Sequence, residues 1–141
     1  MIDKTPKKPD RLFIDKKDKK YYDRLKQEEM FRYKENRHLF LLALGYGFKN
    51  DIKVQLKSKE GFVRTEYLSS ENWSLIKAIA ITVKSIEVLS NPELIFQIVE
   101  EYAHGGIKIL FDEVQSTPFA SFDKKFEKEL HEIYDELNLG D

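Results

Sequence analysis

Residues 71–89 constrain the fold of this chain more than any other stretch, because apolar side chains fall around most of the helix that they would form. These apolar residues are Trp73, Leu75, Ile76, Ala78, Ile79, Ala80, Ile81, Val83, Ile86, Val88 and Leu89. A helix that is apolar on several sides is normally covered by neighbouring elements. The sequence therefore predicts a central core helix over residues 71–89, with Ser69 or Ser70 as its N-cap.

Two more helices are expected before this one. Residues 21–34 carry a loose apolar stripe, and a compact apolar run at residues 39–44 predicts a helix over residues 36–44. We interpret the second run as a buried helix, and a buried strand of the same length is the alternative. The glycines of Gly45-Tyr46-Gly47 follow directly and are typical of a helix stop.

Two helices are expected after it. Asn91 followed by Pro92 is typical of an N-cap and a first helical position, and apolar residues then recur every three or four positions to about Gln115. Ser121 is a candidate cap for a last helix, which Gly140 closes.

A small β element is expected in the middle of the chain. Residues 52–56 alternate apolar and polar side chains, which is the pattern of a half-buried strand. Residues 62–67 return to strand-like composition after a turn sequence that ends in Gly61. The predicted fold class is therefore mainly α (α+β), a compact domain of about five helices with a two-stranded β-hairpin.

Residues 1–20 are predicted to be a basic, partly flexible arm, and residues 21–141 a single mainly helical domain. Two prolines oppose regular structure in the arm, and its apolar cluster at residues 12–14 is expected to dock on the domain or on a partner. Flexible lysines can neutralise phosphates, and interleaved aromatic rings can stack on bases. The candidate nucleic-acid contacts are Lys7, Lys8, Arg11, Lys16, Lys17, Lys19 and Lys20.

The charge of the chain is strongly polarised along the sequence. Residues 1–86 carry a formal charge of +8 and residues 87–141 carry −9, although the net charge is only −1. Aspartates interleaved with the lysines of the arm dilute its field. The polarity indicates a subunit that contacts something anionic at one end and something basic at the other, and head-to-tail self-association into a homo-oligomer stays open.

Residue types that carry chemistry are sparse. The chain has no cysteine, which excludes thiolate metal sites and cysteine nucleophiles. His131 with Glu127 and Asp135 shares a predicted helix face, but favourable side-chain pairs explain that spacing better than a metal site does. The sequence therefore predicts neither enzyme activity nor a cofactor. One alternative is a metal-dependent hydrolase or nuclease centred on His104 and Glu101.

Gly105 and Gly106 form the oddest local feature, since each glycine inside a helix costs about 1 kcal/mol relative to alanine. Gly106 lies on the apolar stripe of its helix, so we expect close packing against another helix there, and a kink or backbone contact with a partner are the alternatives. No apolar run is long enough to cross a membrane, and the basic amino terminus lacks a signal sequence. A cytoplasmic location is therefore expected.

Several blocks of sequence together resemble a known family. They are His38-Leu-Phe-Leu-Leu-Ala-Leu-Gly-Tyr-Gly-Phe48, Leu75-Ile-Lys-Ala-Ile-Ala-Ile81, Ile86-Glu-Val-Leu89 and Glu100-Glu-Tyr-Ala-His-Gly-Gly-Ile-Lys-Ile-Leu110. From about Phe31 to Val114 the chain resembles the Dnd (DNA phosphorothioation) system-associated protein 4 family. The resemblance implies a bacterial or archaeal locus that marks self DNA and restricts phage DNA, and an accessory subunit beside larger ATPases or nucleases. It supplies no active-site residues.

The leading expectation is therefore a small non-catalytic accessory or adaptor subunit of a DNA-modification-linked defence or restriction system. It would act through contacts with larger protein subunits of the same system. The expected partner surface consists of Gly45, Tyr46, Gly47, Phe48, Glu100, Glu101, His104 and Gly105. The alternative is a DNA-binding module that uses the basic arm.

Overall fold

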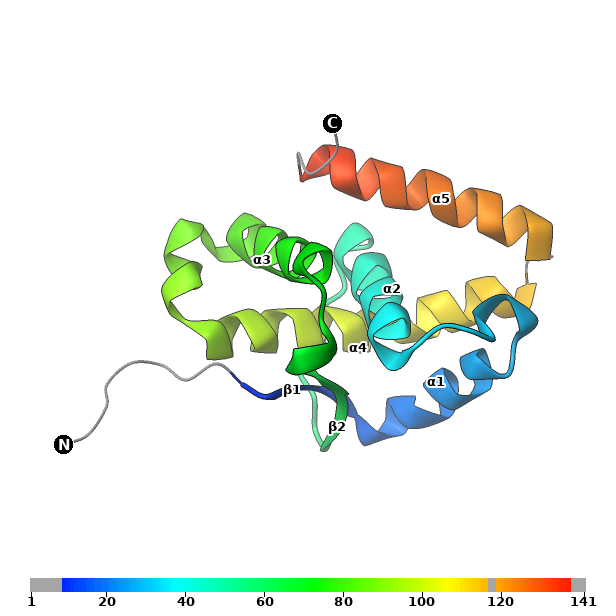
Figure 1. Cartoon of the computed structure of the whole chain (residues 1–141), viewed down its shortest axis with the longest axis horizontal. Helices are drawn as coiled ribbons and strands as arrows, with labels where there is room; N and C mark the ends of the chain where they lie inside the picture. Colours follow the sequence, from blue (N-terminus) through cyan, green and yellow to red (C-terminus); the bar gives the residue numbers. More distant parts are fainter. Residues whose placement is uncertain (1–8, 117–118, 138–141) are drawn as a thin grey trace.

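A computed structural model describes residues 9–116 and 119–137 of the chain, and within these ranges it is mainly helical with one small sheet (Figure 1). Five α-helices and a two-stranded antiparallel sheet confirm the predicted fold class. In chain order the elements are β1 (Arg11–Asp15), α1 (Lys19–Lys26), α2 (Asn36–Lys49), β2 (Lys59–Arg64), α3 (Ser70–Lys84), α4 (Pro92–Ser116) and α5 (Phe119–Glu136). Short 3₁₀ turns lie at Lys16–Asp18, Glu29–Phe31, Thr65–Tyr67 and Ile86–Ser90.

The central element is α4, whose 25 residues give it a length of about 37 Å. Figure 1 shows it running along the molecule, with α2 and α3 on one side and β1, β2 and α1 on the other. It buries residues around most of its circumference: Ile95, Phe96, Ile98, Val99, Glu100, Tyr102, Ala103, Gly106, Ile107, Leu110 and Val114. The hydrophobic core is therefore organised around α4.

The helix predicted over residues 71–89 is present as α3, but it is shorter than predicted and is not the central element. Helix α3 ends at Lys84, and its fully buried residues are restricted to Leu75, Ile76, Ile79 and Ala80. Ser85 has a φ of 94°, which a helix does not allow, and the chain continues as a 3₁₀ turn. Beyond this break Ile86 and Leu89 are 66% and 42% exposed.

Helices α2 and α4 meet backbone to backbone. A Cβ on Gly106 would lie 2.0 Å from the backbone oxygen of Ala43, and a Cβ on Gly47 would lie 1.9 Å from that of Tyr102. No side chain fits at such separations, so glycine is required on both helices. The predicted close packing at Gly106 is confirmed.

The predicted helix stop at residues 45–47 is wrong, because α2 continues through both glycines to Lys49. Its end is instead set by the next residues. The side-chain amide of Asn50 donates to the backbone oxygen of Tyr46 at 2.8 Å, and Asp51 has a left-handed φ of 53°. Aspartate tolerates this conformation better than most residues do, and it reverses the chain after the helix.

The sheet has a different first strand from the one predicted. Strand β2 pairs antiparallel with β1, so that Asp15 faces Lys59 and Arg11 faces Arg64. Residues 52–56 form no strand and cross α4 instead, where the Val54 amide donates to the Glu101 backbone oxygen at 3.1 Å. Because the two strands are separated by about 45 residues, they are not connected as a hairpin.

The predicted arm does not extend to residue 20. Leu12 and Ile14 are 0% and 2% exposed in the core, which confirms that the apolar cluster at residues 12–14 docks on the body. Residues 16–20 form a 3₁₀ turn and the start of α1. Residues 1–8, with Lys7 and Lys8, lie outside the described part of the chain.

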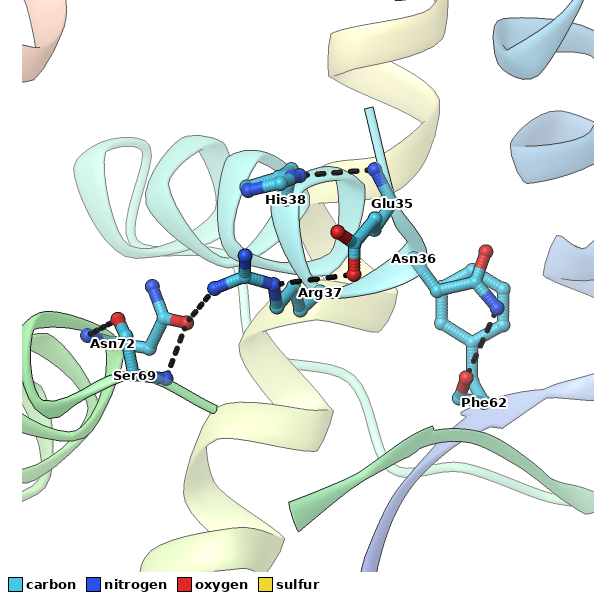
Figure 2. Close-up of polar contacts among 7 residues, drawn as sticks. All are labelled: Glu35, Asn36, Arg37, His38, Phe62, Ser69 and Asn72. Atoms are coloured by element: carbon cyan, nitrogen blue, oxygen red, sulfur yellow. Dashed lines mark hydrogen bonds and ion pairs between the residues drawn. The ribbon is translucent and has the colours of Figure 1, made fainter. Parts of the chain in front are cut away.

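Side-chain hydrogen bonds tie the start of α2 to β2 and α3 (Figure 2). The Asn36 amide donates to the Phe62 backbone oxygen at 3.1 Å, and Arg37 Nη1 donates to Asn72 Oδ1 at 3.2 Å. At the same end of α2, the Glu35 amide donates to His38 Nδ1 at 2.9 Å. His38 must be neutral to accept this bond. Burial, together with neighbouring cations, lowers its pKa in agreement with that state.

Two predicted caps are confirmed. Ser69 Oγ accepts a hydrogen bond from the Asn72 amide at 3.1 Å at the start of α3. Asn91 Oδ1 accepts one from the Leu94 amide at 3.2 Å at the start of α4. The last helix begins earlier than predicted, at Phe119, so Ser121 lies inside α5, and Gly140 lies outside the described residues.

Candidate functional site

The residues predicted as one partner surface lie in separate environments. On α2, Gly47 is buried against α4, and Gly45 and Tyr46 line a groove beneath α5. Phe48 packs edge-on against the ring of Tyr102, with 5.8 Å between centroids. Gly45 and Gly47 of the expected partner surface are therefore buried within the fold.

The residues of that set on α4 face away from α2. The loop at residues 52–54 crosses Glu101 and Gly105, where a Cβ on Gly105 would lie 2.1 Å from the Ile52 backbone oxygen. Glu100 and His104 face β1 and the turn after it. The structure brings these two residues together with buried acids that the sequence does not single out.

We call Asp15, Asp18, Glu100 and His104 the acidic–histidine cluster. His104 Nδ1 lies 2.6 Å from Asp18 Oδ2, and His104 Nε2 lies 3.9 Å from Asp15 Oδ2. The three acids are 1%, 4% and 4% exposed, in sequence order. The cluster therefore joins the end of β1 and the following turn to the middle of α4.

Backbone groups satisfy two of these carboxylates. Asp15 accepts from the amide of Lys17 at 3.0 Å and from that of Lys57 at 2.8 Å, with a longer bond of 3.4 Å from Ser58. Glu100 Oε2 accepts from the Phe13 amide at 2.8 Å, and its Oε1 lies 3.7 Å from Lys59 Nζ. The acids thus replace the hydrogen bonds that these amides would otherwise make with water.

The environment shifts the pKa values of the three acids in different directions. Burial raises the pKa of Asp18, and the contact with His104 opposes that shift only in part. Burial likewise raises the pKa of Glu100 despite the Phe13 amide and Lys59. For Asp15, burial is outweighed by the amides of Lys17, Lys57 and Ser58, so its pKa is lowered.

The cluster differs from the arrangement that the hydrolase alternative requires. That alternative pairs His104 with Glu101, but His104 is paired with Asp18, and Glu101 hydrogen-bonds to Gln97 at 3.3 Å. Within residues 9–116 and 119–137, no three histidine or acidic side chains are grouped as metal ligands. What the cluster visibly does is fasten β1 to α4.

The candidate nucleic-acid contacts within the described ranges lie along β1, the following turn and α1. Arg11 pairs with Asp10 at 3.6 Å, and Lys19 pairs with Asp23 at 2.8 Å. Lys16, Lys17 and Lys20 are exposed. Exposed Lys57 and Lys59 join this region, because the Lys57 amide donates to Asp15 and Lys59 pairs with Asp15 across the sheet. The sequence does not reveal this neighbourhood.

A surface hollow of about 530 Å³ lies between α3 and the start of α4, and we call it the Trp73 hollow. The rings of Trp73 and Phe96 lie 5.6 Å apart in it, and Lys77 Nζ lies 5.7 Å from the Trp73 ring. The sequence assigns Trp73 and Leu89 to a buried helix, because periodicity alone does not show which face a neighbour covers. The lining residues are Ser70, Trp73, Ser74, Lys77, Leu89, Pro92, Ile95 and Phe96.

A mostly apolar groove of about 200 Å³ lies between α2, α3 and α5. Ile133 of α5 packs over Gly45, and Lys49 pairs with Glu129 at 3.4 Å and with Glu132 at 3.3 Å. Tyr46 is 6% exposed, and its hydroxyl faces Glu129 without a hydrogen bond of normal geometry. Burial, with this carboxylate nearby, raises the Tyr46 pKa. The groove is thus the seam along which α5 covers the body.

Comparison with models of known protein families gives one match. The model of the family described as DNA sulphur modification system-associated protein 4 matches residues 12–134. The chain belongs to this family. The match begins at the first buried residue of β1 and ends near the end of α5, so it extends beyond residues 31–114, over which the sequence blocks show the resemblance. Membership of the family associates the protein with a DNA sulphur modification system.

Other comparisons add no relative. No curated protein and no solved structure matches the chain. Among the described helices, none combines the length and the apolar character needed to cross a membrane.

Proposed function

We propose that this protein is a small non-catalytic accessory subunit of a DNA sulphur modification system linked to phage defence or restriction. It acts in the cytoplasm by binding a larger protein subunit of that system. Family membership supports the link to the system. The observation that carries the contact with a protein is the Trp73 hollow, which the fold leaves open at the surface.

The hollow has the composition of a protein-binding surface. Tryptophan is among the residues that contribute most to protein interfaces, and here it is backed by Phe96 and bordered by a lysine and two serines. Leu89, 42% exposed, adds an apolar edge that water covers in the isolated chain. An apolar side chain of the partner, with a carboxylate placed to reach Lys77, fits this combination.

The acidic–histidine cluster supports the non-catalytic part of the proposal. Its acids hold backbone amides of β1 and of the loop before β2, and Asp18 holds His104. Each carboxylate therefore has a structural task that accounts for its burial.

Co-expression with the other products of the same modification locus tests the proposal. The tagged chain is expected to retain one larger subunit through purification and size-exclusion chromatography. Leu89→Gln should reduce the retained partner about tenfold, because loss of about 1.4 kcal/mol of binding free energy changes an equilibrium constant by that factor. If no component of the system is retained, the adaptor function is wrong.

Val54→Gln is the matched control. Val54 is 44% exposed, nearly the same as Leu89, but it lies in the loop that crosses α4 and outside the hollow. It should retain the partner at the wild-type level. Equal losses in the two variants would show that general surface polarity, rather than the Trp73 hollow, controls the interaction.

A further inference from the structure

Strand pairing gathers lysines from two distant segments onto one surface. Asp15 faces Lys59 across the sheet, and the Lys16 amide donates to the Ser58 backbone oxygen at 2.8 Å. The turn after β1 therefore lies beside the loop that precedes β2, and that loop is held on α4 by the Val54 amide. We call the exposed lysines of this turn, of the end of the loop and of the start of β2 the lysine ridge: Lys16, Lys17, Lys57 and Lys59.

The fold separates Asp15 and Asp18 from the neighbouring lysines. In the sequence, aspartates alternate with lysines and dilute the positive charge. In the structure, Asp15 and Asp18 point inward, where backbone amides and His104 are their partners. Lys16, Lys17 and Lys57 form no ion pair with any residue in the described ranges, so their charges face solvent uncompensated.

We infer that the lysine ridge binds the phosphate backbone of duplex DNA. Lysine ammonium groups are point charges that contact phosphates without reading bases, and a duplex presents one phosphate charge per about 1.7 Å of axis. The ridge belongs to the folded body. It shares Lys16 and Lys17 with the arm that the sequence suggests, but strand pairing, rather than flexibility, sets its position.

The aromatic rings near the ridge favour a duplex over a single strand. Binding of single strands relies on rings that stack on bases. Tyr22 is 0% exposed, the Tyr21 ring packs 5.1 Å from that of Phe111, and Lys59 Nζ lies 5.9 Å from the Phe13 ring. Tyr22 is thus closed to a base, and the rings of Tyr21 and Phe13 are half-buried and in contact with other side chains of the fold.

Fluorescence anisotropy with a 20-base-pair labelled duplex of arbitrary sequence tests this inference at 50 and 200 mM salt. The triple variant Lys16→Gln/Lys17→Gln/Lys57→Gln removes ridge charges without touching the backbone amides that hold the cluster. If each lysine contacts one phosphate, the salt slope should fall by about 0.9 per lysine. The wild-type chain should accordingly lose about 40-fold more affinity than the variant between these two salt concentrations.

The matched control is Lys34→Gln/Lys84→Gln/Lys128→Gln, which removes the same charge from exposed positions before α2 and on α3 and α5. It should bind within about twofold of wild type. Equal weakening of both triple variants would reduce the effect to net charge and overturn the inference. Absence of wild-type binding at 50 mM salt would also overturn it.

Two further arms identify the binding element and the ligand. Deletion of residues 1–8 should leave most of the affinity, and complete loss on that deletion, with normal binding by the ridge variant, would assign binding to the arm instead. A single-stranded oligonucleotide of the same length should bind more weakly than the duplex. Tighter binding of the single strand would contradict the assignment to duplex DNA.

Discussion

Two faces of α4 are packed by opposite physical means. Toward α2, the contact is made by backbone atoms, with Gly47 and Gly106 leaving no room for a side chain. Toward β1, it is made by charged side chains, with Glu100 and His104 reaching a strand and a turn. The contact with α2 requires that Gly47 and Gly106 carry no side chain. The contact with β1 requires particular side-chain atoms that form hydrogen bonds.

Because of this difference, substitutions at the two contacts should affect the free energy of unfolding in different ways. Added volume at a backbone contact must displace a whole helix, so the free energy of unfolding should fall steeply and independently of pH. A polar contact can keep part of its hydrogen bonding after a conservative substitution, so its losses should be graded and should depend on pH.

The largest effect is expected for Gly106→Ala. Its Cβ would lie 2.0 Å from the Ala43 backbone oxygen and 2.3 Å from the Gly47 amide nitrogen, neither of which can rotate away. We expect the free energy of unfolding to fall by about 3 kcal/mol, as for a severely overpacked core. Urea unfolding followed by circular dichroism at 222 nm measures this change.

Gly45→Ala is the control on the same pair of helices. Its Cβ would lie 3.4 Å from Ile133 Cδ1, an ordinary contact, and alanine favours the helix by about 1 kcal/mol. This variant should be as stable as the wild type or slightly more so. A Gly106→Ala protein as stable as Gly45→Ala would show that the two backbones are not in contact.

The two faces also differ in how far the sequence predicts them. Gly106 breaks helix propensity on an apolar stripe, and this local conflict correctly predicts close packing. The same reasoning fails for Gly45 and Gly47, because a glycine that ends a helix and one that admits a neighbouring helix look alike until the neighbour is known. Asn50 and Asp51 end α2 instead.

The polar face of α4 could not be predicted, because its parts come from distant segments. Pro9 and the surrounding lysines are not typical of a strand, so the sequence does not indicate β1. Its partner strand lies about 45 residues later, and no tight turn between the two strands signals the pairing. Without that pairing, Asp15 and Asp18 read as solvated charges. By contrast, the caps Ser69 and Asn91 depend on neighbours within three residues, and both are confirmed.

A smaller effect is expected for Asp15→Asn. The amide side chain keeps one acceptor oxygen, but its NH₂ group faces a backbone amide that previously had a carboxylate oxygen. One unsatisfied buried donor should lower the free energy of unfolding by about 2 kcal/mol. Asp10→Asn is the control, since Asp10 is 87% exposed and, among the described residues, its side chain pairs with Arg11 alone. Its change should stay within about 0.5 kcal/mol.

Chemical denaturation at neutral pH measures both aspartate variants. If Asp10→Asn destabilised the protein as much as Asp15→Asn, burial of the Asp15 carboxylate would not be what holds the turn to the loop before β2.

The smallest effect is expected for Glu100→Gln, and its sign depends on pH. Burial raises the Glu100 pKa above its ordinary 4.5, with Glu101 adding to the rise and Lys59 opposing it. The folded state therefore binds this proton more tightly than the unfolded state does, so stability from Glu100 is present below pH 4.5 and is lost as the pH rises through the raised pKa. Glutamine removes this loss while it can still accept from the Phe13 amide. Relative to wild type, Glu100→Gln should thus gain stability as the pH rises from 4.5 through the raised pKa of Glu100.

Asp15→Asn supplies the opposite sign in the same cluster. The Asp15 pKa is lowered, so its contribution is complete above pH 3.8 and is lost as the pH falls through the lowered value. Urea unfolding of wild type and both variants from pH 3 to 7 should therefore show the wild-type advantage over Asp15→Asn fading only at the acid end. The difference in free energy of unfolding between wild type and Glu100→Gln should instead change above pH 4.5. Parallel pH profiles for all three proteins would mean that the acids on this face of α4 act as neutral hydrogen-bond acceptors, and the contrast with the glycine face would then be one of shape alone.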